Sequence, residues 1–206
     1  MARRTTDFDP DLEFAPGELE RYLQVPKRPR SLRALASITD PVEFAGSLMV
    51  AIGCDDERKL TKLPQLCRLA VTVNAIELER SSGGFFQVIA NSSPRVALDA
   101  VGFLREIGAV KTSRLLARAI ARLPDGEVPR SSRAKAAILQ AMEQAAGADP
   151  FRKEDAAFSR SGEDVLALLR AYVLSRPAAL KAKSACAELL PKKASMGRGG
   201  SPHSSL

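Results

Sequence analysis

The chain has 206 residues and a formal net charge of +7, and 45% of its residues are hydrophobic while only 5% are aromatic. This composition excludes wholesale disorder and favours a core of aliphatic side chains, which is typical of packed helices. No stretch of the sequence approaches the roughly 18 apolar residues that a membrane-spanning helix needs. We therefore expect a cytoplasmic protein without membrane contact.

Most of the positive charge lies at the C-terminal end of the chain. Residues 176–206 hold six basic side chains and one acidic side chain, whereas residues 36–175 hold 18 and 17 and are nearly neutral. A basic tail of this kind raises nonspecific affinity for nucleic acid, which makes nucleic acid an alternative partner.

The side chains that several common chemistries require are missing. The only histidine, His203, and the scattered Cys54, Cys67 and Cys186 cannot supply the four ligands of a zinc site or a cysteine–histidine pair. The adjacent carboxylates of residues 55–57 cannot converge on a hard cation by themselves. We expect no metal, no cofactor and no catalytic set, so the sequence favours a non-enzymatic function.

Residues 1–37 are expected to form an arm and a linker. Residues 16–23 fit one short helix, and two prolines among basic residues follow it and interrupt any longer one. A helical domain over residues 38–190 comes next. Residues 191–206 are rich in Gly, Ser and Lys, which is typical of a disordered tail.

The first strong helical signals follow residue 38. Asp40 is a suitable N-cap, Pro41 fits the first turn, and Gly53 can end the helix. The expected inward residues of this helix are Val42, Ala45, Leu48, Met49 and Ile52. The next helix begins near Pro64 and is apolar on nearly all sides until Glu77, which predicts a central position in the fold.

Four more helices are expected further along the chain. They cover residues 94–107, 111–123, 132–147 and 163–176. In the helix over 111–123 the expected inward residues are Leu115, Leu116, Ala119, Ile120 and Leu123. In the helix over 163–176 they are Val165, Leu168, Leu169, Tyr172 and Val173. Residues 149–162 are interpreted as a connection, and residues 177–190 as a final helix. Since no period-two pattern predicts a strand, we expect an all-α single domain of about six to eight helices.

The segment ELERSSGGFFQVIANSSP, residues 77–94, must end one helix and begin another within a few residues. We expect Gly83 to adopt the left-handed conformation that ends a helix, and Gly84 to be the N-cap of the next. Phe85 and Phe86 begin that helix, and at least one of them should enter the core. Gln87, three residues after the cap, can hydrogen bond back to the Gly84 amide.

The end of this segment leaves two interpretations open. Asn91 tolerates the left-handed conformation and can end the second helix, after which Ser92 or Ser93 can cap the next. The segment is either a structural joint, or its exposed amides form an anion or ligand site with Asn91 and Ser92. Glu79 is expected to cap backbone amides of the joint, and the alternative is a hydrolase that uses Glu79 in an apolar pocket.

Three arginines recur every four residues on one predicted helix. Arg114, Arg118 and Arg122, here called the arginine stripe, could track the phosphates of a nucleic acid. The same pattern is typical of the outer face of an amphipathic helix, and no aromatic side chains accompany it for base stacking.

Several motifs in order along the chain resemble the signature of a bacterial helical domain of unknown function, which also forms the C-terminal part of a DNA-mimic protein family. The matching residues are Glu79, Gly83, Gly84, Phe85, Gln87, Asn91, Ser92 and 107–109, followed by 155–158 and 168–177. The similarity covers roughly residues 40–180 and implies an all-helical, partner-binding domain. Ser82 departs from the signature, which usually has Asn there, and Val88 and Ile89 replace aromatic residues.

The charge pattern limits what the resemblance implies for function. A DNA mimic presents carboxylates at phosphate-like spacing, which the nearly neutral residues 36–175 do not provide. Our leading hypothesis is a protein-interaction or regulatory module whose partner is another protein. Its expected surface consists of Glu79, Gly83, Gly84, Phe85, Gln87, Asn91 and Ser92. The alternative is a nucleic-acid-binding protein that uses the arm, the arginine stripe and the tail.

Overall fold

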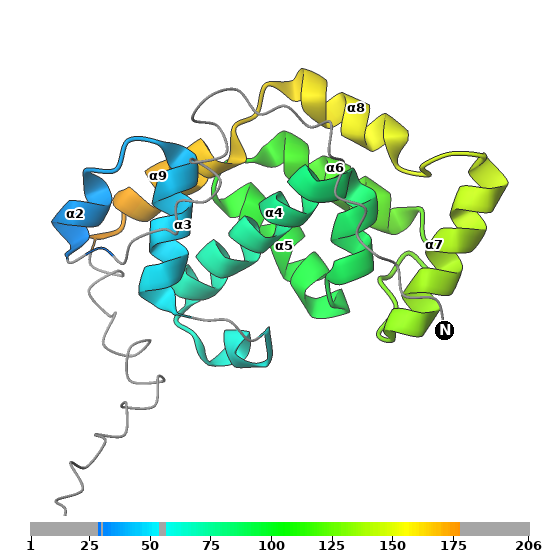
Figure 1. Ribbon diagram of the computed structural model, residues 1–206, viewed down its shortest axis with the longest axis horizontal. Coiled ribbons are helices and arrows are strands. Elements are labelled where there is room, and N and C mark those ends of the chain that lie inside the picture. Colours follow the sequence, from blue (N-terminus) through cyan, green and yellow to red (C-terminus); the bar gives the residue numbers. More distant parts are fainter. Residues whose placement is uncertain (1–28, 30, 54–56, 178–206) are drawn as a thin grey trace, which may run out of the picture.

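The computed structural model describes residue 29, residues 31–53 and residues 57–177, and within these ranges the chain forms eight α-helices, one 3-10 helix and no strand. Figure 1 shows their arrangement. The elements are α2 (Leu32–Ala36), α3 (Pro41–Ile52), η1 (Glu57–Lys62), α4 (Gln65–Asn91), α5 (Pro94–Glu106), α6 (Val110–Ala121), α7 (Ser132–Ala146), α8 (Arg152–Ser161) and α9 (Val165–Leu174). The all-α prediction is confirmed. In the part of the chain described, no helix is both long and apolar enough to cross a membrane.

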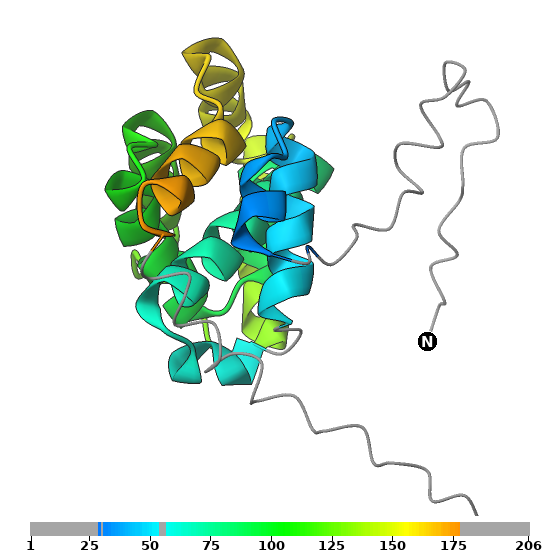
Figure 2. The same ribbon diagram turned by 90° about the vertical axis from the view of Figure 1, so that its left-hand side faces the viewer.

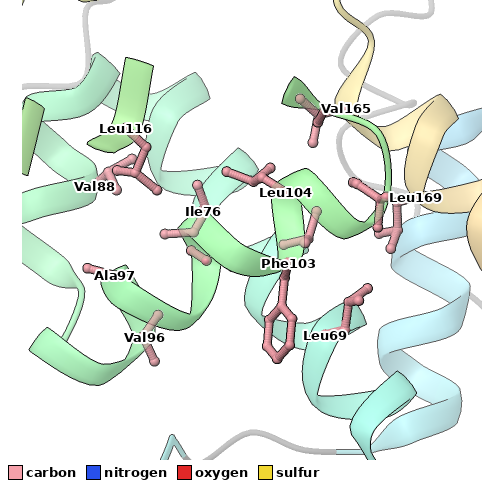
Figure 3. Packing of buried hydrophobic residues seen from close by; sticks show 14 of the residues in the cluster. Leu69, Ile76, Val88, Val96, Ala97, Phe103, Leu104, Leu116, Val165 and Leu169 are labelled. Atoms are coloured by element: carbon pink, nitrogen blue, oxygen red, sulfur yellow. The ribbon is translucent and has the colours of Figure 1, made fainter. Parts of the chain in front are cut away.

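Helix α4 lies at the centre of the fold, as its nearly continuous apolar surface predicts. It packs against α3, α5, α7, α8 and α9 (Figure 1). Its fully buried side chains include Leu69, Val73 and Ile76. Figure 3 shows Leu69 and Ile76 among the buried residues of α5, α6 and α9, which form one hydrophobic core.

Helices α2, α3 and α9 lie side by side at one end of the molecule (Figure 2). Arg170 of α9 donates from Nε to the Ile38 carbonyl oxygen at 2.8 Å, which fastens α9 to the loop between α2 and α3. Leu35 of α2 is buried, so this helix is part of the core although residues 1–37 were expected to form an arm and linker. The rest of that arm, the expected helix over 177–190 beyond Pro177, and the tail lie outside the described residues.

The ends of α3 agree with the sequence, but its inward face differs. The Asp40 carboxylate accepts a hydrogen bond from the Glu43 amide at 2.8 Å, and Gly53 ends the helix with a φ of 66°. Val42, expected to face inward, is 67% exposed, and the fully buried Phe44 occupies the core instead. The inward prediction for Val42 is wrong because the buried stripe passes through Phe44, Leu48 and Ile52.

The interpretation of residues 149–162 as a connection is also wrong, since they contain helix α8. Few of its side chains are apolar, which leaves almost no periodic signal. Its ends nevertheless carry helical features: Glu154 and Asp155 lie in the first turn, Arg160 in the last, and Gly162 follows with a φ of 65°. Helix α8 packs against α6 and α4 (Figure 1).

The start of α6 has a tertiary cap from the loop after α8. Its own N-cap residue is Ala109, which offers no side-chain acceptor. Glu163 supplies the acceptors: its carboxylate accepts from the Lys111 amide at 3.1 Å, the Thr112 amide at 2.7 Å and the Thr112 hydroxyl at 2.6 Å. The free amides of the first turn of α6 are therefore satisfied by a residue about 50 positions later in the chain.

Replacing Glu163 with Ala should lower the free energy of unfolding by about 1–2 kcal/mol, because two helix-end amides lose their acceptor. Urea titration of the full chain measures this. The matched control is Glu143→Ala on the exposed side of α7, which should change stability by less than about 0.5 kcal/mol. Equal effects of the two substitutions would contradict the capping role.

Candidate functional site

Helix α4 is interrupted at Gly83 and Gly84, which we call the break. Gly83 has an extended φ of −177°, and Gly84 has a left-handed φ of 67° before the helix resumes at Phe85. The sequence predicted a helix end at this point, but it assigned the left-handed conformation to Gly83. In the structure the positive φ falls on Gly84, and its ψ of −161° differs from the left-handed helical conformation that was expected.

The second part of α4 begins with an amide that is capped by a carboxylate of α8. The Phe85 amide donates to Oδ1 of Asp155 at 2.9 Å. A Cβ on Gly84 would lie only 2.5 Å from Oδ2 of Asp155. Position 84 therefore needs glycine for two independent reasons, the left-handed backbone and the close approach of this carboxylate.

Asp155 takes the capping role that was expected of Gln87 and Glu79. Gln87 packs instead over the break, where a Cβ on Gly83 would meet Gln87 Cβ at 3.2 Å. Burial of the Asp155 carboxyl raises its pKa, and the bond from the Phe85 amide opposes this change. The neighbouring Asp149 carboxylate raises the pKa further, whereas the positive charge of Arg80 lowers it.

Arg80 lies just before the break and connects α4 with α8. Its Nε donates to the Glu77 carboxylate at 3.0 Å, and its guanidinium lies 3.7 Å from the centre of the Phe158 ring. A guanidinium over an aromatic face is held by the negative charge of the ring face. These contacts and the Asp155 cap hold both sides of the break against α8.

A polar bridge spans the break on its outer side. Asn91 Nδ2 donates to Oε2 of Glu79 at 2.6 Å. Asn91 is the last helical residue of α4, as predicted, but no non-glycine residue in the described ranges has a positive φ, so it does not end the helix through the left-handed conformation. The bridge joins the last turn of α4 to the turn before the break.

The structure divides the expected surface residues into three groups. Gly83 and Asn91 are exposed, Glu79, Gly84 and Gln87 are half-buried, and Phe85 and Ser92 are buried. The Phe85 side chain belongs to the core, and the Ser92 carbonyl accepts from the Lys135 ammonium of α7 at 2.8 Å. Phe85 and Ser92 therefore contribute buried contacts to this segment, and their side chains do not lie on its surface.

Two residues that matter at the break were not identified from the sequence. Asp155 is one, although it belongs to the motif at 155–158 that carries part of the resemblance. The other is Leu78, which precedes the break by five residues in α4 and is 64% exposed. No local pattern distinguishes Leu78 from the buried leucines of α4, because its exposure depends on which side of the helix its neighbours cover.

The arginine stripe is partly engaged with the protein itself. Arg118 Nη2 lies 3.3 Å and Arg122 Nη1 lies 2.9 Å from the two oxygens of Glu154, a buried carboxylate of α8. Arg114 is exposed one turn earlier. The exposed side chains agree with the outer face of an amphipathic helix, whereas the pairing of Arg118 and Arg122 with Glu154 was not predicted from the sequence.

A groove of about 440 Å³ lies between the second part of α4 and α7. Its lining residues are Phe86, Ala90, Ser132, Ala136, Leu139, Gln140 and Glu143. Glu143 is the single titratable side chain among them, and Glu79 does not belong to the lining. Within the described ranges, no three His, Cys, Asp or Glu side chains are placed to hold a metal ion.

Replacing Gly84 with Ala should lower the free energy of unfolding by about 2 kcal/mol or more, because it adds backbone strain and a clash with Asp155. Gly102 in α5 is the matched control, since a Cβ there meets nothing within 4 Å. Gly102→Ala should stabilise the protein by up to about 1 kcal/mol. Thermal or urea unfolding compares the two, and a neutral Gly84→Ala variant would contradict the packing of the break.

Comparison with known proteins identifies the family. The family profile described as DMP19-like protein matches residues 61–176, more than half of the chain, from η1 to just beyond α9. The match includes the break, the Asp155 cap and the arginine stripe. Searches of curated proteins and of solved structures gave no match. The chain belongs to the DMP19-like protein family.

Proposed function

We propose that this protein is a non-enzymatic interaction module that binds another protein through the outer side of the break in α4. The proposed break surface consists of Leu78, Glu79, Gly83, Gln87 and Asn91. The observation that carries the proposal is the exposed Leu78, which directly precedes Glu79 of the polar bridge in the chain. Surfaces that bind other proteins combine apolar side chains with hydrogen-bonding groups.

Rigidity of the break supports this proposal. Phe85 is fully buried, its amide is held by Asp155, and Arg80 is clamped between Glu77 and Phe158. A surface fixed in this way loses little conformational entropy when a partner binds, so more of the contact energy contributes to affinity.

The proposed partner contact differs from DNA mimicry, in which free carboxylates imitate phosphates. The carboxylates around the break are occupied: Asp155 by the Phe85 amide, Glu77 by Arg80, and Glu79 by Asn91. Recognition at the break surface therefore rests on apolar contact and hydrogen bonding. The hydrolase alternative is less well supported than the interaction module, since Glu79 is hydrogen bonded to Asn91 and does not line the groove between α4 and α7.

Two exposed leucines offer a matched test of the break surface. Leu78→Glu should abolish capture of the partner by the tagged full chain, because it places a charge in the apolar part of the contact. Leu98→Glu changes a leucine of similar exposure on α5 and should leave capture intact. Both variants should unfold within about 0.5–1 kcal/mol of the wild type, since both side chains are solvent-exposed.

Two outcomes of this capture experiment would contradict the proposed break surface. Partners captured equally by wild type, Leu78→Glu and a second variant, Asn91→Ala, would place binding elsewhere on the molecule. Loss of the same partners with Leu98→Glu alone would assign the contact to α5 and overturn the proposal.

A further inference from the structure

The arginine stripe on α6 is held in place by a buried carboxylate. The Glu154 side chain is only 4% exposed, while those of Arg118 and Arg122 are 62% and 41% exposed. Each arginine binds Glu154 through one terminal nitrogen. A guanidinium has five N–H donors, so both side chains keep donors that face solvent in a fixed orientation.

The stripe keeps a positive charge after this pairing. Glu154 offsets one of the two charges of Arg118 and Arg122, and Arg114 adds another at an exposed position of the same helix face. Residues four apart on an α-helix are separated by about 6 Å along its axis. The stripe therefore presents cationic groups in a row at steps of about 6 Å.

A segment of the same chain has the complementary pattern. Residues 5–20 contain six acidic residues and no basic residue, and the run Asp7–Glu13 has an acidic side chain at every second position. These residues are Asp7, Asp9, Asp11 and Glu13. Every second side chain of an extended strand lies on the same side, at a repeat of about 6.6–6.8 Å. Pro10 disfavours a helix through this run.

The chain is long enough to bring this segment to α6. Seventeen residues separate Glu13 from Ser31, where the described structure begins to be continuous. With the short helix expected over residues 16–23, this stretch still spans about 40–45 Å. A compact domain of this size has a radius of gyration of only about 15 Å, so a segment of this length can extend over much of the surface.

We propose that the acidic segment Asp7–Glu13 binds along the arginine stripe of α6, as an intramolecular occupant that excludes other anionic partners. The acidic side chains pair with the solvent-facing donors of Arg114, Arg118 and Arg122. Glu154 is a positioning residue in this arrangement, because it orients two of the guanidiniums. This inference concerns a surface distinct from the break surface and does not rest on the proposed function.

Photo-crosslinking from within the acidic segment tests the proposal in the full chain. With p-benzoylphenylalanine in place of Phe8, mapped crosslinks should fall on α6 and the adjoining face of α8. Their yield should drop at least about threefold between 0.05 M and 0.5 M salt, because exposed ion pairs are screened. The same drop should follow Asp7→Asn, Asp9→Asn, Asp11→Asn and Glu13→Gln together.

Single arginine substitutions make the test specific and leave the Glu154 pairs intact. Arg114→Gln should lower the crosslink yield, whereas Arg133→Gln, an exposed arginine on α7, should not. Two results would overturn the proposal: crosslinks scattered over the surface, or a crosslink yield on α6 that changes neither with salt nor with Arg114→Gln. Crosslinks that join two chains and rise with protein concentration would overturn its intramolecular form.

A short DNA duplex serves as an anionic probe that competes with the acidic segment for the stripe. Binding of a short DNA duplex should be stronger for the variant with the four neutralised side chains than for the wild type, because the occupant has been weakened. Equal binding by both proteins would show that the segment does not cover the stripe, and would contradict the proposal.

Discussion

The hydrogen bond between the Phe85 amide and Asp155 is the contact on which the arrangement around α4 depends. In this bond a carboxylate of α8 caps the first amide of the second part of α4. The carboxylate fits there because residue 84 is a glycine and has no Cβ. The apolar side chain of Phe85 then enters the core, and Asn91 returns to Glu79 on the outside. The Phe85–Asp155 bond therefore lies between the buried and the outer contacts of the break.

Acidic side chains between residues 154 and 163 contact both α4 and α6. Asp155 caps α4, Glu163 caps α6, and the buried Glu154 pairs with two arginines of α6. Each bond satisfies a helix-end amide or a buried charge that would otherwise lower stability. These three carboxylates are therefore occupied by structural contacts within the protein.

The sequence predicted the helices whose apolar residues recur regularly, together with their local caps, as the agreement at Asp40 and Gly53 shows. It placed the break at the correct glycines because glycine pairs interrupt helices. It failed where the deciding partner is distant in the sequence. Asp155 lies 70 residues beyond Phe85, α8 has too few apolar residues for a periodic signal, and the exposure of Val42 and Leu78 depends on which helices pack beside them.

Residue-resolved amide hydrogen exchange at Phe85 tests the central claim most directly. In the wild type this amide should be protected, because it donates to a partly buried carboxylate. In Asp155→Ala its exchange should accelerate by roughly 10- to 100-fold more than that of α9 amides, as expected for the loss of a hydrogen bond to a charged group. Unchanged protection at Phe85 in this variant would contradict the account, because the break would then be held without Asp155.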